Sequence, residues 1–237
     1  MFYYYDTTIM ILIPAMLLAA FADHKVKSCF NRYSRVGNRR HMTGAEAARR
    51  VLDYNGLNDV RIQLIAGHLS DNYNPGNRIL SLSSDVYNGT SISAVGVACH
   101  EVGHAIQHSR GYIPLKLRNA IVPVTNFASS LTWPMIMIGL LLLVVGNGSL
   151  YYIGDTLFNI GALAFVVIIL FHLITLPVEI NASRRAIKSI KEYNILTEEE
   201  VPGASKVLRA AALTYIAALA VAVSNLLRIL AIRGRSE

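Results

Sequence analysis

The chain has 237 residues, of which 53% are apolar, and its formal net charge is +7. This composition indicates a membrane protein with room for one modest domain outside the bilayer. Two cysteines, Cys29 and Cys99, exclude a framework of disulfides and fit a reducing compartment. The basic residues flank apolar segments and no recognisable nucleic-acid module accompanies them, so we expect no nucleic-acid partner.

Four apolar stretches are close to the length needed to cross a bilayer and carry almost no charge. They run from Phe2 to Ala22, from Phe127 to Val145, from Leu157 to Pro177 and from Ala210 to Leu230. We therefore expect a predominantly α membrane protein with about four transmembrane helices. Ala20-Phe21-Ala22 resembles a signal-peptide cleavage site, but Asp6 and the absence of Lys or Arg before it favour a retained helix.

Basic residues set the expected orientation, because loops rich in Lys and Arg stay on the cytoplasmic side. Six follow the first stretch between positions 25 and 40, four lie between positions 184 and 191, and the loop from Asn147 to Thr156 has none. The segments after the first and third stretches should therefore face the cytoplasm. Arg233 and Arg235 fall on the wrong side if the fourth stretch spans, so that stretch either ends at the interface or overrides the rule.

The segment after the first stretch contains signals for short helices and strands. Thr43-Gly44-Ala45-Glu46 is a capping box and Asn55-Gly56 a stop signal, so Thr43 to Asn55 is predicted as a short amphipathic helix. Val60 to Ile65 and Arg78 to Ser83 alternate as strands with the turn residues Asn74 to Asn77 between them, which predicts a hairpin or two successive strands. A strand here either holds an extended substrate by its open edge or is an ordinary sheet strand.

The next predicted helix, Ser91 to His108, carries the motif His100-Glu101-Val102-Gly103-His104. Positions i and i+4 share a helix face, so His100 and His104 can bind one zinc ion together. Glu101 would act as the general base on the water that attacks a peptide carbonyl. Gly103 disfavours a helix, which is unexpected unless a packed neighbour or a bound peptide approaches the backbone closely at that point.

A catalytic zinc needs a third protein ligand, and two nearby residues fail as candidates. Cys99 points about 100° away from the metal face, so we expect it to be a small buried residue. His108 lies about 12 Å along the helix from His100, which is too far for zinc bonds of about 2 Å. Glu179 directly follows the third stretch on the expected side, and such an acid is either the third ligand or an interfacial acid paired with Arg.

These patterns together predict five successive parts of the chain. They are a transmembrane helix over 1–24, a cytoplasmic catalytic domain with a small sheet and the motif helix over 25–120, two transmembrane helices over 121–177, a cytoplasmic helix with the third ligand over 178–206, and a fourth hydrophobic helix with a basic tail over 207–237. The portion outside the bilayer is expected to be small, α+β and zincin-like.

Several spaced segments resemble the bacterial membrane zinc metallopeptidases of the YugP type, over most of the chain. They are MTGAEAARRVLDYNGL, LSDNYNPGNRILSLSSDVYNG, SISAVGVACHEVGHAIQH, PLKLRNAIVPVTNFAS and LPVEINASRRA. The resemblance implies His100, His104 and Glu179 as zinc ligands and Glu101 as the catalytic residue. The H-E-x-x-H with a downstream E-x-x-A is more distantly similar to the HtpX and CAAX prenyl protease clan.

The chain departs from these family patterns beside the expected ligands. Asn181 and Ser183 stand where an Asp is common, and Asn72 and Asn74 replace a His and an Asp. A zinc-bound imidazole usually donates its second N–H to a carboxylate or a carbonyl, so an amide or hydroxyl would be a weaker acceptor. A second oxyanion donor is also expected, and its candidates are His172, Arg184, Arg185 and Tyr193.

We therefore expect a Zn²⁺-dependent endopeptidase in the plasma membrane of a bacterium, cutting protein substrates at the cytoplasmic face. Its expected partners are membrane lipid and a peptide or protein substrate, and a regulatory membrane partner stays undefined. One alternative is an intramembrane metalloprotease, although Ser91 to His108 has too few uninterrupted apolar residues to span. The other is a membrane scaffold that binds metal without catalysis.

Overall fold

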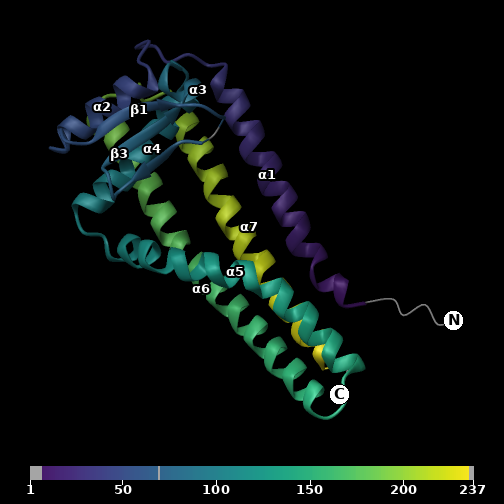
Figure 1. Ribbon diagram of the computed structural model, residues 1–237. Coiled ribbons are helices and arrows are strands. Elements are labelled where there is room, and N and C mark those ends of the chain that lie inside the picture. Colours follow the sequence, from purple (N-terminus) through teal and green to yellow (C-terminus); the bar gives the residue numbers. More distant parts are fainter. Residues whose placement is uncertain (1–6, 69, 235–237) are drawn as a thin grey trace. The chain divides into compact units, whose positions relative to one another are not determined.

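The computed structural model describes residues 7–68 and 70–234, and the chain is mostly helical (Figure 1). Its contacts divide it into two compact units. The apolar unit comprises the described parts of Met1–Phe21, Leu117–Thr175 and Tyr215–Glu237, and the site unit comprises Ala22–Lys116 and Leu176–Thr214. Helices α1 (Ile13–Ser34), α5 (Ile113–Val145), α6 (Ser149–Glu192) and α7 (Val201–Arg233) each contribute to both units. A short 3-10 helix, η1 (Thr7–Ile11), precedes α1.

The site unit contains the short helices and the sheet that the sequence predicts. Its remaining elements are α2 (Gly44–Tyr54), β1 (Arg61–Ile65), β2 (Asn72–Asn74), β3 (Ile79–Ser83), α3 (Ser84–Tyr87) and α4 (Ile92–Ser109). The predicted capping box closes α2, because the Thr43 hydroxyl accepts from the Glu46 N–H while the Glu46 carboxylate accepts from the Thr43 N–H. Ser91 caps α4 by accepting from the Ala94 N–H.

The three strands are ordered β1-β3-β2, with β1 parallel and β2 antiparallel to β3. A hairpin between the two predicted strands is therefore wrong. The turn residues Asn74 to Asn77 do close a hairpin, but its first strand is β2, because the intervening segment doubles back and allows β1 to join β3 from the other side. The central position of β3 explains why Leu80 and Leu82 are fully buried.

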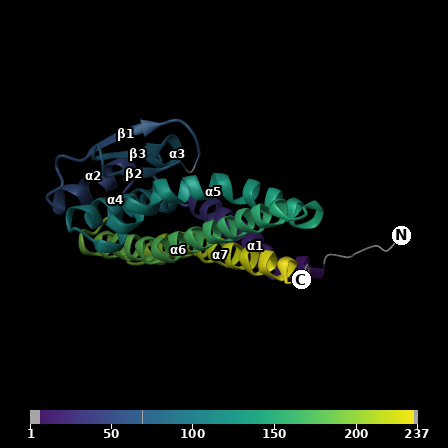
Figure 2. The same cartoon turned by 60° about the horizontal axis from the view of Figure 1, so that its bottom comes forward.

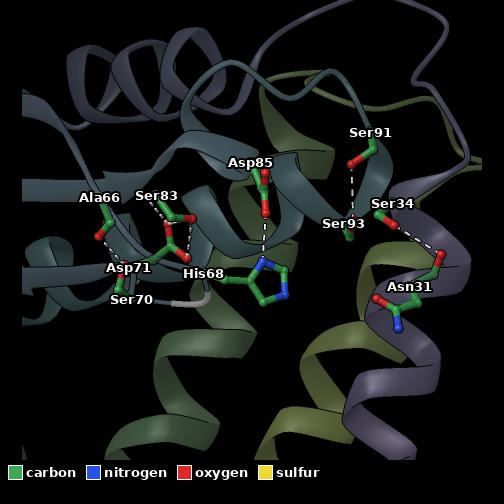
Figure 3. A network of polar contacts seen from close by, with 10 residues as sticks. All are labelled: Asn31, Ser34, Ala66, His68, Ser70, Asp71, Ser83, Asp85, Ser91 and Ser93. Carbon is green, nitrogen blue, oxygen red and sulfur yellow. Dashed lines mark hydrogen bonds and ion pairs between the residues drawn. The ribbon is translucent and has the colours of Figure 1, made fainter.

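Polar side chains hold the segment that leads from β1 to β2. Asp71 accepts hydrogen bonds from the Ser83 N–H and hydroxyl, and the His68 ring contacts the Asp85 carboxylate at 2.6 Å (Figure 3). These bonds fasten the connection to the end of β3 and the start of α3. In Figure 2 the strands form a layer beside α2 and α4.

The core of the site unit joins the sheet to the helices. Its members are apolar side chains at the inward faces of β3, α2, α4, α6 and α7, among them Leu52, Leu80, Val95, Val102, Ile190 and Leu208. The predicted burial of Cys99 is confirmed, since its side chain is fully buried in this cluster. Burial raises the pKa of the Cys99 thiol to about 12, so it stays protonated and unreactive at neutral pH.

Helices α4 and α6 approach each other closely at Gly103. A Cβ atom at this position would lie 2.5 Å from the carbonyl oxygen of Ala182 and 3.1 Å from its carbonyl carbon. A packed neighbour is therefore the reason for a glycine inside this helix, and the neighbour is the backbone of α6. The small Ala182 side chain, which is also buried, lets the two backbones meet.

The apolar unit contains the main parts of α5, α6 and α7. Within the described residues, these three helices are long and apolar enough to cross a membrane, and α1 and α4 are not among them. The predicted count of four spans is therefore not confirmed. The first expected span begins at Phe2, and residues 2–6 of it lie outside the described residues. Phe158, Ile136 and Ile229 pack together in this unit. Pro177, where we expected the third stretch to end, lies inside α6, which continues to Glu192.

The end of α7 is fastened to the beginning of α6 in the apolar unit. Arg233 forms an ion pair of 2.6 Å with Asp155 and also bonds the side chain of Asn159. The two helix ends therefore lie together, and the positive charge of Arg233 has an acidic partner there. Arg235, the other basic residue of the predicted tail, lies outside the described residues.

Gly103→Ala should destabilise the protein although alanine is the better helix former. The gain in helix propensity is about 1 kcal/mol, whereas overpacking against the backbone carbonyl of Ala182 costs about 1 to 3 kcal/mol. Any separation of α4 from α6 would destabilise the protein further. We expect a lower unfolding temperature by circular dichroism and a reduced affinity for zinc. Gly37→Ala is the control, because a Cβ there meets nothing within 4 Å. Equal unfolding temperatures for both variants would contradict the packing argument.

Candidate metal centre

Three side chains converge where α4 passes α6 in the site unit. The Nε2 atom of His100 lies 3.2 Å from a carboxylate oxygen of Glu179, and the Nε2 atom of His104 lies 3.5 Å from the same oxygen. One ligand atom from each residue falls within 4.8 Å of the others. Tetrahedral zinc bonds of about 2.0 to 2.2 Å place neighbouring ligand atoms roughly 3.4 Å apart, so the spacing suits one zinc ion.

The three side chains are shielded from solvent to different degrees. Glu179 is only 3% exposed, and the side chains of His100 and His104 are 15% and 9% exposed. An isolated carboxylate at such a position would be costly, and charge compensation by imidazolium or a bound cation offsets that cost. The contacts of Glu179 with the two histidines are those expected of a third metal ligand.

The tautomer of His104 is fixed by a chain of hydrogen bonds. The Gln107 side-chain amide donates to the Val178 carbonyl oxygen at 2.8 Å and to the Asn181 Oδ1 at 3.0 Å. Its nitrogen is thereby oriented away from His104, and its oxygen faces the Nδ1 of His104 at 3.0 Å. That oxygen can only accept, so Nδ1 carries a proton and donates it to Gln107, while Nε2 faces Glu179.

The polar chain behind His104 ends on an arginine. The Arg185 Nε donates to Asn181 Oδ1 at 2.7 Å, so Asn181 accepts from two sides at once. Asn181 thus acts on the metal centre through Gln107 rather than by contacting an imidazole directly. Gln107 was not identified from the sequence. Its sequence signal is a further polar residue three positions after His104 on the same helix. The structure shows that its side chain is fully buried.

His100 has a separate partner on α6. Its Nδ1 lies 3.1 Å from the Ser183 hydroxyl oxygen, which can accept the imidazole proton. Both histidines therefore have a hydrogen-bond acceptor behind them, and in both cases the Nε2 atom is turned toward Glu179. At the two positions that depart from the family pattern, Asn181 orients Gln107 behind His104, and the Ser183 hydroxyl lies behind His100.

Glu101 lies on α4 beside the cluster and is partly accessible. Burial raises the pKa of its carboxyl group above the ordinary value, while the nearby His100 and His104 oppose the rise. Burial alone would lower the pKa of His104, but its hydrogen bond to Glu179 and the charge of Glu101 leave that pKa raised on balance. These influences place Glu101 within electrostatic reach of all three converging residues.

The other residues considered from the sequence occupy different positions. His108 bonds the Tyr73 hydroxyl through its Nδ1 at 2.9 Å and is not part of the cluster. Tyr193 stacks on Tyr54 with ring centroids 4.4 Å apart. Arg184 is exposed, and His172 belongs to the apolar unit, so no oxyanion donor is assigned among the four candidates.

A pair of histidines one helical turn apart, an adjacent glutamate and a glutamate from a second helix define a zincin type of centre. The family described as "Putative neutral zinc metallopeptidase" matches residues 8–234, and this chain belongs to that family. It is 47% identical over 231 residues to a Bacillus subtilis (strain 168) protein called "Putative membrane protease YugP", covering 97% of this chain and 98% of that protein. No solved structure matches. The resemblance seen in the sequence to the YugP-type proteins is thereby confirmed.

Replacing any one of the three converging residues should remove the metal. We expect about one zinc ion per wild-type chain by inductively coupled plasma mass spectrometry, and a loss of most of it in His100→Ala, His104→Ala and Glu179→Ala. His108→Gln is the matched control, since it removes a histidine from the same helix without touching the cluster. Unchanged zinc in folded Glu179→Ala would refute its role as a ligand.

Proposed function

We propose that this protein is a zinc-dependent endopeptidase that hydrolyses peptide bonds of protein substrates at the cytoplasmic face of the membrane. The observation that carries the proposal is the convergence of His100 and His104 on Glu179, with Glu101 beside them. Two imidazoles and one carboxylate are a ligand set that zinc uses in catalytic centres, where one position is left for water.

The donor set fits zinc in protonation as well as in position. The Gln107 oxygen accepts the Nδ1 proton of His104, and the Ser183 hydroxyl can accept the Nδ1 proton of His100. Both Nε2 atoms are therefore available as zinc ligands. Glu179 supplies one negative charge, which matches a divalent cation better than a third neutral imidazole would. A bound zinc ion would supply Lewis-acid chemistry, activating water and polarising the peptide carbonyl.

Glu101 is the residue proposed to move protons. Its carboxylate takes a proton from the attacking water and afterwards gives one to the leaving amine. Its position on the same helix as both histidines fixes its distance from the metal ligands.

Placement at the cytoplasmic face rests on charge. The site unit contains all the basic residues between positions 25 and 40 and between positions 184 and 191, whereas the turn between α5 and α6 has none. Full crossing by α7 is supported by its ion pair between Arg233 and Asp155, which offsets the positive charge at that end.

The two alternative functions have less support. An intramembrane metalloprotease would carry its motif on a spanning helix, but α4 is not among the candidate spans of the described residues and packs in the core of the site unit. A metal-binding scaffold would have no need for a partly accessible Glu101 beside the ligands.

Glu101→Gln should leave the zinc content and the unfolding temperature unchanged but lower proteolysis at least about 100-fold, the usual contribution of a general base. Purified protein in phospholipid vesicles can be tested with fluorescein-labelled casein as a general substrate. Glu46→Gln, on the exposed capping box of α2, is the control for loss of one carboxylate. Proteolysis by zinc-loaded Glu101→Gln at the wild-type rate would refute the mechanism.

The face of the membrane can be tested with single cysteines on a Cys29→Ser, Cys99→Ala background. We expect Ala66→Cys, in an exposed loop of the site unit, to react with a membrane-impermeant maleimide only after lysis. Ser149→Cys, exposed beside the turn between α5 and α6, should react in intact cells. The reverse labelling pattern would place the site unit outside the cell.

A further inference from the structure

A groove of about 420 Å³ lies between α6 and α7 in the site unit. Its walls are mainly apolar and are formed by Ile180, Ile187, Leu208 and Ala212, and two guanidinium groups, those of Arg184 and Arg209, also line it. The groove therefore combines a hydrocarbon-like surface with two positive charges, and the described structure places no acidic side chain among its lining residues.

The two arginines of the groove differ from three other arginines of the chain. Arg39, Arg49 and Arg233 each form an ion pair with a carboxylate. Within the described residues, neither Arg184 nor Arg209 does so, and both are exposed. Two uncompensated guanidinium groups on one groove attract an anion, and the planar donor fork of arginine suits phosphate.

The groove also occurs at a particular level along its two helices. The apolar stretch of α6 ends at Pro177, three residues before Ile180, and the apolar stretch of α7 begins at Ala210, next to Arg209. Both helices thus line the groove where their apolar stretches end. In a bilayer this is the level of the headgroups, with the hydrocarbon region on the side of Ile180 and Ala212.

We propose that this groove binds one anionic phospholipid, with its phosphate at Arg184 and Arg209 and an acyl chain along Ile180 and Ala212. Basic pockets between membrane helices bind lipid headgroups in this manner. An acidic peptide segment would satisfy the two charges but would leave the apolar walls at the bilayer level without a hydrocarbon partner. The lipid would lie one side chain from the metal cluster, because Ser183 lines the groove and contacts His100.

The test measures lipid binding and does not depend on peptidase activity. Full-length protein in a non-ionic detergent is titrated with phosphatidylglycerol or phosphatidylcholine, and bound lipid is counted by native mass spectrometry. We expect one tightly bound phosphatidylglycerol per chain and weaker binding of phosphatidylcholine. An arginine near an anionic headgroup contributes about fivefold in affinity, so Arg184→Gln with Arg209→Gln should weaken phosphatidylglycerol binding about 25-fold.

The matched control is Lys188→Gln with Lys206→Gln. These two lysines are exposed on the same helices and do not line the groove, so binding should change less than twofold. Ala212→Phe supplies a second, uncharged variant, which should weaken binding by filling the groove while both arginines remain. Circular dichroism and the unfolding temperature establish that each variant is folded.

Four results would overturn the proposal. An equal loss in the lysine pair would show diffuse attraction to the surface, and equal affinity for phosphatidylcholine would remove the role of charge. Displacement of phosphatidylglycerol by inorganic phosphate or by an acidic peptide at the same concentration would identify an anion site without lipid preference. Wild-type binding by folded Ala212→Phe would exclude the groove itself.

Discussion

The close approach of two helix backbones at Gly103 and Ala182 is the constraint on which the metal centre depends. A side chain at position 103 would push α6 away, and Glu179 would then no longer reach His100 and His104. The same approach brings Val178, Asn181 and Ser183 of α6 within hydrogen-bond distance of side chains on α4. The positions of the three converging side chains and the orientation of the imidazoles therefore both depend on this packing contact.

The hydrogen bonds behind the ligands show how amide and hydroxyl groups can serve where carboxylates are common. Both N–H groups of the Gln107 amide donate to acceptors on α6, so its oxygen must point toward His104. This oxygen accepts the proton on Nδ1 of His104. No negative charge is added behind the imidazole. Glu179 is therefore the negatively charged member of the three converging residues.

Local signals in the sequence predicted the helices well, and the cluster itself could be inferred in part. Thr43 and Ser91 cap their helices because capping depends on residues three positions apart, and the two motif histidines need only one helical turn. Gln107 could not be assigned, because its role depends on Val178 and Asn181, which are more than 70 positions away. The parallel pairing of β1 with β3 was also missed. The turn residues before β3 do not specify which earlier strand pairs with it.

The separation of the ligands along the chain also has a consequence for the time at which the centre forms during synthesis. Glu179 follows His100 by 79 positions, and between them lie α5 and most of the apolar part of α6. At about 5 to 20 residues per second, the ribosome needs roughly 4 to 16 s to reach the third ligand after the first. During that interval the chain holds only half of a zinc site. A nascent chain therefore cannot bring the three converging side chains together until the part of α6 that carries Glu179 has been made.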